Sequence, residues 1–332
     1  MLLGHYPFRA LGSPCELHLW GESRADIDAI AEEAKSLVLR IERKYSRYRD
    51  DSVVSEINRS AGDARGVRVD DETASLLDYA ATAFEHSGGL FDVTSGSLRR
   101  IWNFKSGRVP SPVEVTGALR CVGWSRVRWE RPTLVLTVPG MELDFGGFGK
   151  EWAVDAVAEL CRSRGVRHGM VDLGGDLRAI GPHPDGRPWL VGVRDPRAPE
   201  RALASVPLFD QGLATSGDYE RCMVVDGVRY THILDPRTGW PVTGLRSASV
   251  IAPQCLVAGT ATTIALLKGA RDGVRFLDSL GLPSLRMDAD GRVSGTLAGA
   301  RRPCRTPAGS RLAGSEIDAA PARAGRSAPR RT

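Results

Sequence analysis

The sequence predicts an α+β protein, in which packed helices and mixed sheets form one body with two intertwined lobes. Two patterns favour this fold class: helical periodicity over residues 26–45 and 71–87, and an alternation of strand, glycine-rich turn and helix over residues 141–176. The composition agrees, because 332 residues with 42% hydrophobic and 26% charged content are typical of a globular chain. The longest apolar runs, such as residues 264–267, are far shorter than the roughly 18 residues of a membrane span. We therefore expect no membrane span.

Two amphipathic helices are expected in the first part of the chain. Residues 26–45 repeat apolar side chains with a period near 3.6, with Ser23 and Asp26 as candidate caps. The following residues, 46–62, are expected to form a loop. The second helix covers residues 71–87 and ends at two consecutive glycines.

Strands and helices alternate further along the chain. Residues 126–141 predict two short strands around a proline turn, and a helix over residues 150–164 follows a glycine-rich segment. Further strands are expected at residues 166–173, 188–194, 221–225 and 247–251. Two helices, over residues 260–268 and 272–280, complete the body.

The positive charge is concentrated at the C-terminal end. Residues 299–332 contain eight arginines and two acidic residues, so the remainder of the chain has a net charge of −1 although the whole carries +5. No basic field is left to attract nucleic acid, which we do not expect as a partner. The composition of residues 299–332 predicts a disordered Arg-rich tail attached to a domain formed by residues 1–298.

The six cysteines are scattered, with no CxxC pair and no histidine at metal-ligand spacing. This pattern argues against a zinc site, an iron–sulfur cluster or a dense disulfide framework. Free thiols fit a reducing compartment, and the N-terminal residues show neither a signal peptide nor a lipid-attachment motif. A cytoplasmic location is therefore expected.

A glycine-rich segment, DFGGFGK at residues 144–150, lies between a predicted strand and a predicted helix. Bare backbone there can approach a phosphate, and the positive end of the helix favours its negative charge. The spacing is neither that of GxGxxG nor that of a P-loop. A tight turn without a ligand explains the segment equally well.

Two more segments carry candidate chemistry. His232 lies three residues before Asp235 in a turn-rich segment, where a buried, hydrogen-bonded structural histidine is the first interpretation. Residues 214–218, ATSGD, offer hydroxyl and backbone donors either to a ligand or to an ordinary Asx or Ser turn. Neither segment identifies a reaction by itself.

Seven segments of the chain change this picture when they are taken in order. They are FRALGS (8–13), YSRYR (45–49), GLFDVT (89–94), DFGGFGKEWAVD (144–155), VDLGGDLRAIG (171–181), ATSGDYER (214–221) and THILDPRTGWPV (231–242). In amino-acid sequence and in order they resemble the segments of the FAD:protein FMN transferase family, also called the ApbE family. The resemblance covers about residues 8–281.

This resemblance implies a T-fold-related α+β protein that binds FAD between its lobes and cleaves the FAD pyrophosphate with Mg²⁺. FMN is then attached through a phosphoester to a Thr or Ser of an acceptor flavoprotein, and AMP leaves. Leu11 is implied near the flavin, Tyr48 near the adenine, and His232 as the catalytic base. The full set of implied cofactor contacts is Leu11, Tyr48, Leu90, Phe91, Asp92, Asp144, Lys150, His232 and Ile233.

The resemblance also implies a magnesium site, with the backbone of Gly147 and a motif at residues 258–263 that includes Thr262 and Thr263. This chain has Gly259 where the family pattern has an aspartate, so one negatively charged ligand is missing at that position. If the ligand position is vacant, Gly259→Asp is expected to lower the magnesium requirement. If another carboxylate already occupies the space, the substitution is expected to weaken activity.

Other oxygens are candidates to replace that ligand, and we expect Asp176, Asp218 or additional water to complete the metal shell. A second departure is Glu151-Trp152, which stands where the family pattern has Gly-Tyr. We expect the fold to absorb this change easily.

Three functions remain open at this level. The first is a working transferase. The second is an FAD-binding homologue with weak or no transfer, acting as a flavin carrier or regulator, and the third is an FAD pyrophosphate hydrolase that releases FMN and AMP. Release of AMP with and without an acceptor protein separates them.

Overall fold

The computed structural model describes residues 1–219 and 221–300. Its largest element is an eight-stranded sheet in which every neighbouring pair of strands is antiparallel. In spatial order the strands are β1 (Leu2–Ala10), β2 (Ser13–Gly21), β6 (Gly169–Leu173), β7 (Asp176–Ile180), β10 (Gly212–Gly217), β13 (Leu245–Ala252), β14 (Ser284–Asp288) and β15 (Val293–Ser294). Helices and sheets are mixed, so the predicted α+β class is confirmed.

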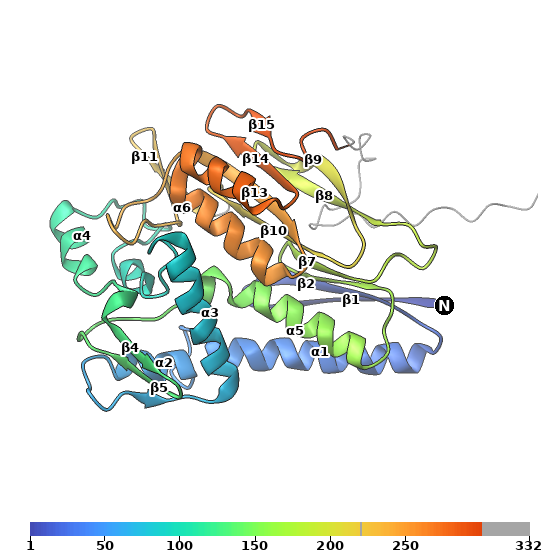
Figure 1. Ribbon diagram of the computed structural model, residues 1–332, viewed down its shortest axis with the longest axis horizontal. Coiled ribbons are helices and arrows are strands. Elements are labelled where there is room, and N and C mark those ends of the chain that lie inside the picture. The colour runs from blue at the N-terminus through green and yellow to red at the C-terminus, as the bar shows by residue number, and fades with distance from the viewer. Residues whose placement is uncertain (220, 301–332) are drawn as a thin grey trace, which may run out of the picture.

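Three long helices pack on one face of this sheet and lie side by side in Figure 1. They are α1 (Arg24–Tyr45), α5 (Gly149–Ser163) and α6 (Cys255–Leu280). The core between helices and sheet is rich in small side chains, among them Ala31, Ala153 and Ala258, each fully buried. Small side chains allow the helices to approach one another and the sheet closely.

The opposite face of the sheet is covered by a long hairpin of β8 (Trp189–Asp195) and β9 (Ala198–Leu208). Leu177 and Ala179 of β7 point into the core beneath this hairpin, whereas Ile180 belongs to the core on the helical face. The middle of the sheet is therefore buried on both faces.

A second lobe is built around α3 (Asp71–Ser87) and a small sheet in the order β3 (Val67–Arg68), β5 (Thr133–Leu136) and β4 (Val127–Glu130). The other elements near it are α2 (Val53–Arg59), η1 (Gly96–Arg100), α4 (Pro112–Leu119), η2 (Trp124–Arg126), η3 (Phe145–Gly147) and the hairpin of β11 (Cys222–Val225) and β12 (Val228–Thr231). The two lobes share a boundary, because Tyr45, Trp152 and Ile233 pack against the cores of both.

Most predicted elements are confirmed. Ser23 caps α1 by accepting a hydrogen bond from the backbone N–H of Asp26, and Gly88 ends α3 in the left-handed conformation. The loop expected over residues 46–62 is partly wrong, because it contains α2, capped by Ser52 and held by the buried Val54 and Ile57.

The two helices expected over residues 260–268 and 272–280 form one element, α6, interrupted at Gly269 (φ 77°, ψ −171°). The element begins five residues earlier than expected, at Cys255. Its start is fixed by the Asp155 carboxylate of α5, which accepts hydrogen bonds from the N–H groups of Cys255 (2.9 Å) and Leu256 (2.8 Å).

Among the described residues, no helix is both long and apolar enough to cross a membrane. The expected disordered tail, residues 299–332, lies outside the described residues except for its first two positions.

Candidate active site

Asp144 anchors the glycine-rich segment. Its Oδ1 accepts a hydrogen bond from the N–H of Gly146 (2.8 Å), and its Oδ2 lies 3.1 Å from both Arg47 Nη1 and Arg99 Nε. The carboxylate is thus fully engaged in holding the short helix η3 and the loops that carry the two arginines. A Cβ on Gly147 would lie 3.3 Å from the Phe91 ring, so a bare backbone fits this turn tightly.

Lys150 stands in the first turn of α5 and connects it to the β6–β7 turn. Its Nζ lies 2.7 Å from Asp176 Oδ2 and donates to the carbonyl of Gly174 (3.3 Å). Beside it is a small hollow, whose lining also includes Gly175, Arg194 and Thr215. The glycine backbone of this turn can approach an anionic group, and Lys150, already paired with Asp176, lies beside it.

Ser216, next to the last residue of β10, contacts both threonines expected at the magnesium site. Its Oγ lies 2.8 Å from Thr262 Oγ1 and 3.1 Å from Thr263 Oγ1. Thr262 Oγ1 also donates to the carbonyl of Gly259 (2.9 Å). Three hydroxyl oxygens and Gly259 thus meet where β10 packs against α6.

Glu151 is the neighbour of Gly259 that the sequence analysis missed. A Cβ on Gly259 would lie 2.5 Å from Glu151 Cγ and 2.7 Å from its Oε1, so the glutamate already occupies that space. Glu151 is only 8% exposed, and its Oε2 has no hydrogen-bond partner. Burial, followed by the nearby charge of Asp176, raises the pKa of Glu151.

Of the two oxygen donors expected in place of the missing aspartate, Asp176 is buried and paired with Lys150. Asp218 differs, because its Oδ1 is buried without a hydrogen-bond partner. Burial raises the pKa of this carboxyl.

His232 is held by the backbone of Arg221. Its Nδ1 lies 3.1 Å from the Arg221 carbonyl oxygen, and its backbone N–H donates to the same oxygen (3.0 Å). A carbonyl only accepts, so Nδ1 is the protonated nitrogen and Nε2 of the neutral ring carries the lone pair. Burial, followed by the charges of Arg99 and Arg221, lowers the pKa of His232 to about 4. At neutral pH the ring is therefore an uncharged base.

The segment at Leu90, Phe91 and Asp92 is buried. The Asp92 carboxylate accepts hydrogen bonds from the N–H groups of Thr94 (2.8 Å) and Trp124 (2.9 Å), and burial raises its pKa. This pairing shapes the turn that carries Phe91 to the glycine-rich segment.

Leu11 and Tyr48 lie outside the cluster around Gly259. Leu11 occupies the β1–β2 turn with φ 54°, partly buried against the main core. Tyr48 is 82% exposed, and the Arg47 guanidinium lies 5.7 Å from its ring centroid. Arg47 also pairs with Asp144, so its guanidinium lies between the exposed ring and the glycine-rich segment and contacts both. Ile233 packs at the boundary of the two lobes.

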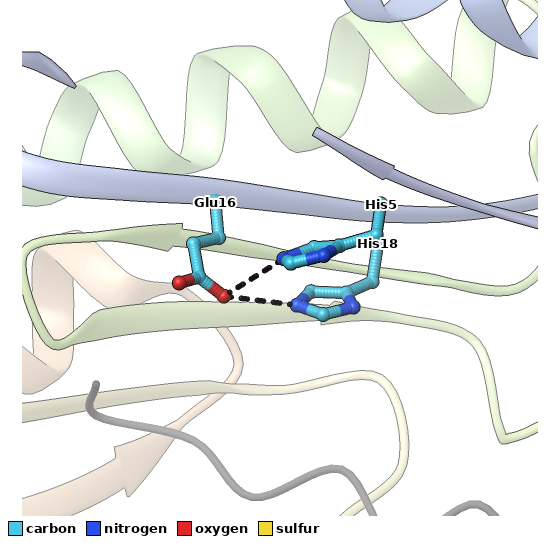
Figure 2. A group of neighbouring side chains, drawn as sticks. All are labelled: His5, Glu16 and His18. Carbon is cyan, nitrogen blue, oxygen red and sulfur yellow. Dashed lines mark hydrogen bonds and ion pairs between the residues drawn. The ribbon is translucent and has the colours of Figure 1, made fainter. Parts of the chain in front are cut away.

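A separate group of side chains that could hold a metal ion lies on the β1–β2 hairpin. Figure 2 shows His5 and His18, a cross-strand pair, both directed at Glu16. Glu16 Oε2 is 3.2 Å from His5 Nε2 and 3.3 Å from His18 Nε2, and the three ligand atoms lie within 4.8 Å of one another. Of the residues proposed for the active site, only Leu11 belongs to the same hairpin.

Fold and site together define an α+β protein with a hollow beside Lys150, a buried carboxyl group without a hydrogen-bond partner at Glu151, and a neutral imidazole at His232. These groups are of the kinds that bind and process phosphate-bearing ligands. The family model of the ApbE family matches residues 11–285. The chain belongs to this family.

Relatives and solved structures agree. The FAD:protein FMN transferase of Treponema pallidum is 32% identical over 304 residues, covering 85% of this chain and 84% of that protein. The FAD:protein FMN transferase of Vibrio cholerae is 30% identical over 267 residues, covering 79% and 80%. The ApbE protein of Thermotoga maritima has a similar structure, with a TM-score of 0.81, 33% identity, and coverage of 89% of this chain and 97% of that one. The flavin transferase ApbE from Vibrio cholerae superposes with a TM-score of 0.78 at 27% identity, covering 90% and 98%.

Proposed function

We propose that this chain is an FAD:protein FMN transferase. It cleaves the pyrophosphate of FAD and attaches FMN through a phosphoester to a Thr or Ser of an acceptor flavoprotein. The oxygen of the acceptor hydroxyl forms a bond to the FMN phosphorus, the bond from that phosphorus to the AMP oxygen breaks, and AMP leaves. The observation that carries this proposal, beside family membership, is the neutral His232 ring with its Nε2 lone pair.

His232 acts as the base for the acceptor hydroxyl. The Arg221 carbonyl fixes the tautomer by accepting from Nδ1, so the hydroxyl proton moves to Nε2. Burial, followed by the charges of Arg99 and Arg221, keeps the ring unprotonated over the physiological range by lowering its pKa. Positioning and base assistance are the contributions that phosphoryl transfer takes from protein side chains.

FAD is placed by residues on both lobes. The hollow beside Lys150 and Arg194 suits the pyrophosphate charge. Leu11 belongs to the flavin side, Leu90 and Phe91 to a turn that contacts the cofactor, and the exposed ring of Tyr48 offers a stacking surface for adenine.

Magnesium is the proposed cofactor. The donors fit, because the site holds an unpartnered buried carboxylate oxygen and a group of hydroxyl oxygens, and Mg²⁺ prefers oxygen ligands. We assign its binding to the carbonyl of Gly147 and to the segment from Gly259 to Thr263, which includes Thr262. When bound, the ion neutralises charge on the pyrophosphate.

We place this activity in residues 1–298, as one catalytic unit, and in the cytoplasm. The second assignment is supported by the five described cysteines, which are all free of disulfides.

The test is AMP release from FAD in magnesium buffer, with and without an acceptor domain carrying a Ser/Thr flavinylation motif. A transferase releases AMP only with the acceptor and makes the acceptor fluorescent in a denaturing gel. AMP release without acceptor indicates hydrolysis, and FAD binding without AMP release indicates a carrier or regulator.

A matched pair of variants isolates the base. His232→Ala is expected to abolish labelling while FAD binding persists. His168→Ala is the control, because His168 Nδ1 also bonds a backbone carbonyl, that of Pro182 at 2.7 Å, on a different element. Equal labelling by wild type and His232→Ala would remove this residue from the mechanism.

A further inference from the structure

Helices α5 and α6 meet at Glu151 and Gly259. The would-be Cβ of residue 259 lies 2.5 Å from Glu151 Cγ, a separation that real Cβ atoms essentially never show. The nearest carboxyl atoms, Oε1 and Cδ, lie at 2.7 and 2.9 Å. The long glutamate and the bare glycine are therefore a steric pair: the side chain of Glu151 fills the place where a side chain on α6 would stand.

The Glu151 carboxylate is buried beside other acidic groups that already have partners. Asp176 pairs with Lys150 at 2.7 Å, and Asp155 accepts from Arg178 and from two backbone N–H groups at the start of α6. Oε2 of Glu151 has no hydrogen-bond partner. A buried polar atom in this state is strongly unfavourable unless a further group satisfies it.

The surroundings indicate what that group is. Glu151 abuts Gly259, whose carbonyl accepts from Thr262, and Thr262 in turn contacts Ser216. Thr263 lies one helical turn after Gly259, on the same side of α6, and also contacts Ser216. A carboxylate with several neutral oxygens and added acidic charge nearby suits a small hard cation.

We propose that Glu151 of α5 supplies the carboxylate ligand of the divalent cation in this chain, in the space that a side chain at position 259 of α6 would otherwise fill. The inference rests on the proposed function for the use of the ion, but its binding test does not. It replaces the expectation that position 259 leaves the ligand shell vacant. The fold was expected to absorb the presence of Glu151 in place of the family's glycine. This inference instead gives Glu151 a specific role.

The experiment is isothermal titration of the full-length protein with MgCl₂ in the absence of FAD, together with thermal unfolding with and without Mg²⁺. Magnesium is the probe because the imidazoles of His5 and His18 suit transition metals better. Glu151→Gln is expected to weaken Mg²⁺ binding by at least about tenfold and to remove the rise in Tm that Mg²⁺ gives the wild type. Glu159→Gln is the control, because it removes one carboxylate from the exposed side of the same helix.

A swap tests the steric pair. Gly259→Asp alone is expected to weaken Mg²⁺ binding, because its side chain collides with Glu151. The double variant Glu151→Ala/Gly259→Asp moves the carboxylate from α5 to α6, and is expected to bind Mg²⁺ within about threefold of wild type. Circular dichroism confirms that each variant is folded, and Gly259→Ala reports the effect of the collision without a new carboxylate.

Unchanged Mg²⁺ affinity and an unchanged Tm rise in folded Glu151→Gln would overturn the proposal. So would a loss of binding in Asp218→Asn with full binding in Glu151→Gln, which would assign the ligand to Asp218. If Mg²⁺ binding depends on Glu151 but no AMP is released from FAD with an acceptor, the proposed function fails and the ligand assignment stands. If AMP release persists with full Mg²⁺ affinity in Glu151→Gln, only the ligand assignment fails.

Discussion

The low pKa of His232 predicts how flavin transfer responds to acid. With a pKa of about 4, the ring is about 97% neutral at pH 5.5, whereas an ordinary histidine of pKa 6.5 is only about 9% neutral there. The fraction of rings able to accept a proton is therefore about tenfold higher at pH 5.5 than for an unperturbed histidine. The acid limb of the pH–rate profile is expected near pH 4.

The assay is single-turnover AMP release at saturating FAD, Mg²⁺ and acceptor, measured from pH 4 to pH 8. His232→Gln keeps a hydrogen-bond donor for the Arg221 carbonyl but removes the base, and is expected to lower the rate by roughly 10²- to 10⁴-fold. Arg99→Gln removes one of the charges that lower the pKa, so its acid limb is expected to move toward pH 6.5. A wild-type acid limb at pH 6.5, or an unchanged profile in Arg99→Gln, would refute the electrostatic reasoning.

Three further predictions concern binding and stability. Tyr48→Ala is expected to raise the Kd for FAD about fivefold, since stacking on adenine contributes about 1 kcal/mol. The Kd for FMN, which has no adenine, is expected to stay unchanged. Equal effects on both ligands in fluorescence titrations would contradict the adenine assignment. Asp155→Asn is expected to lower the free energy of unfolding by about 1–3 kcal/mol in urea, because Arg178 and the N-terminus of α6 lose a charged acceptor. Lys150→Met is expected to weaken binding of ADP by more than that of riboflavin, which carries no phosphate, and equal weakening would argue against the anionic hollow.

The elements that the sequence predicts well are those whose signals are local. The helix α3 has a capping aspartate, a regular apolar face and a terminal glycine in left-handed conformation, and its observed bounds are the expected ones. The helix α2 has only seven residues and two buried apolar side chains, too few to show a period. The early start of α6 depends on Asp155, a cap supplied by another helix, which no local pattern contains.

The candidate site was likewise predictable only where its residues form local sequence motifs. The resemblance identified the threonines and the glycine-rich segment, and the structure brings Thr262 and Thr263 together at Ser216. The partner of Gly259 was missed, because Glu151 is distant in sequence and meets it only when α5 packs on α6. The sequence nevertheless contained a signal for this pair. Compared with the family pattern, position 151 has a glutamate in place of glycine, and position 259 has a glycine in place of aspartate.

The central claim, transfer of FMN to a hydroxyl, is tested most directly by intact-mass analysis of the acceptor domain after incubation with FAD, Mg²⁺ and this protein. The predicted result is a mass increase equal to FMN less one water, lost when the acceptor Thr or Ser is replaced by Ala, with one AMP released per labelled acceptor. An unlabelled acceptor with FAD intact, or with free FMN and AMP in solution, would contradict the claim.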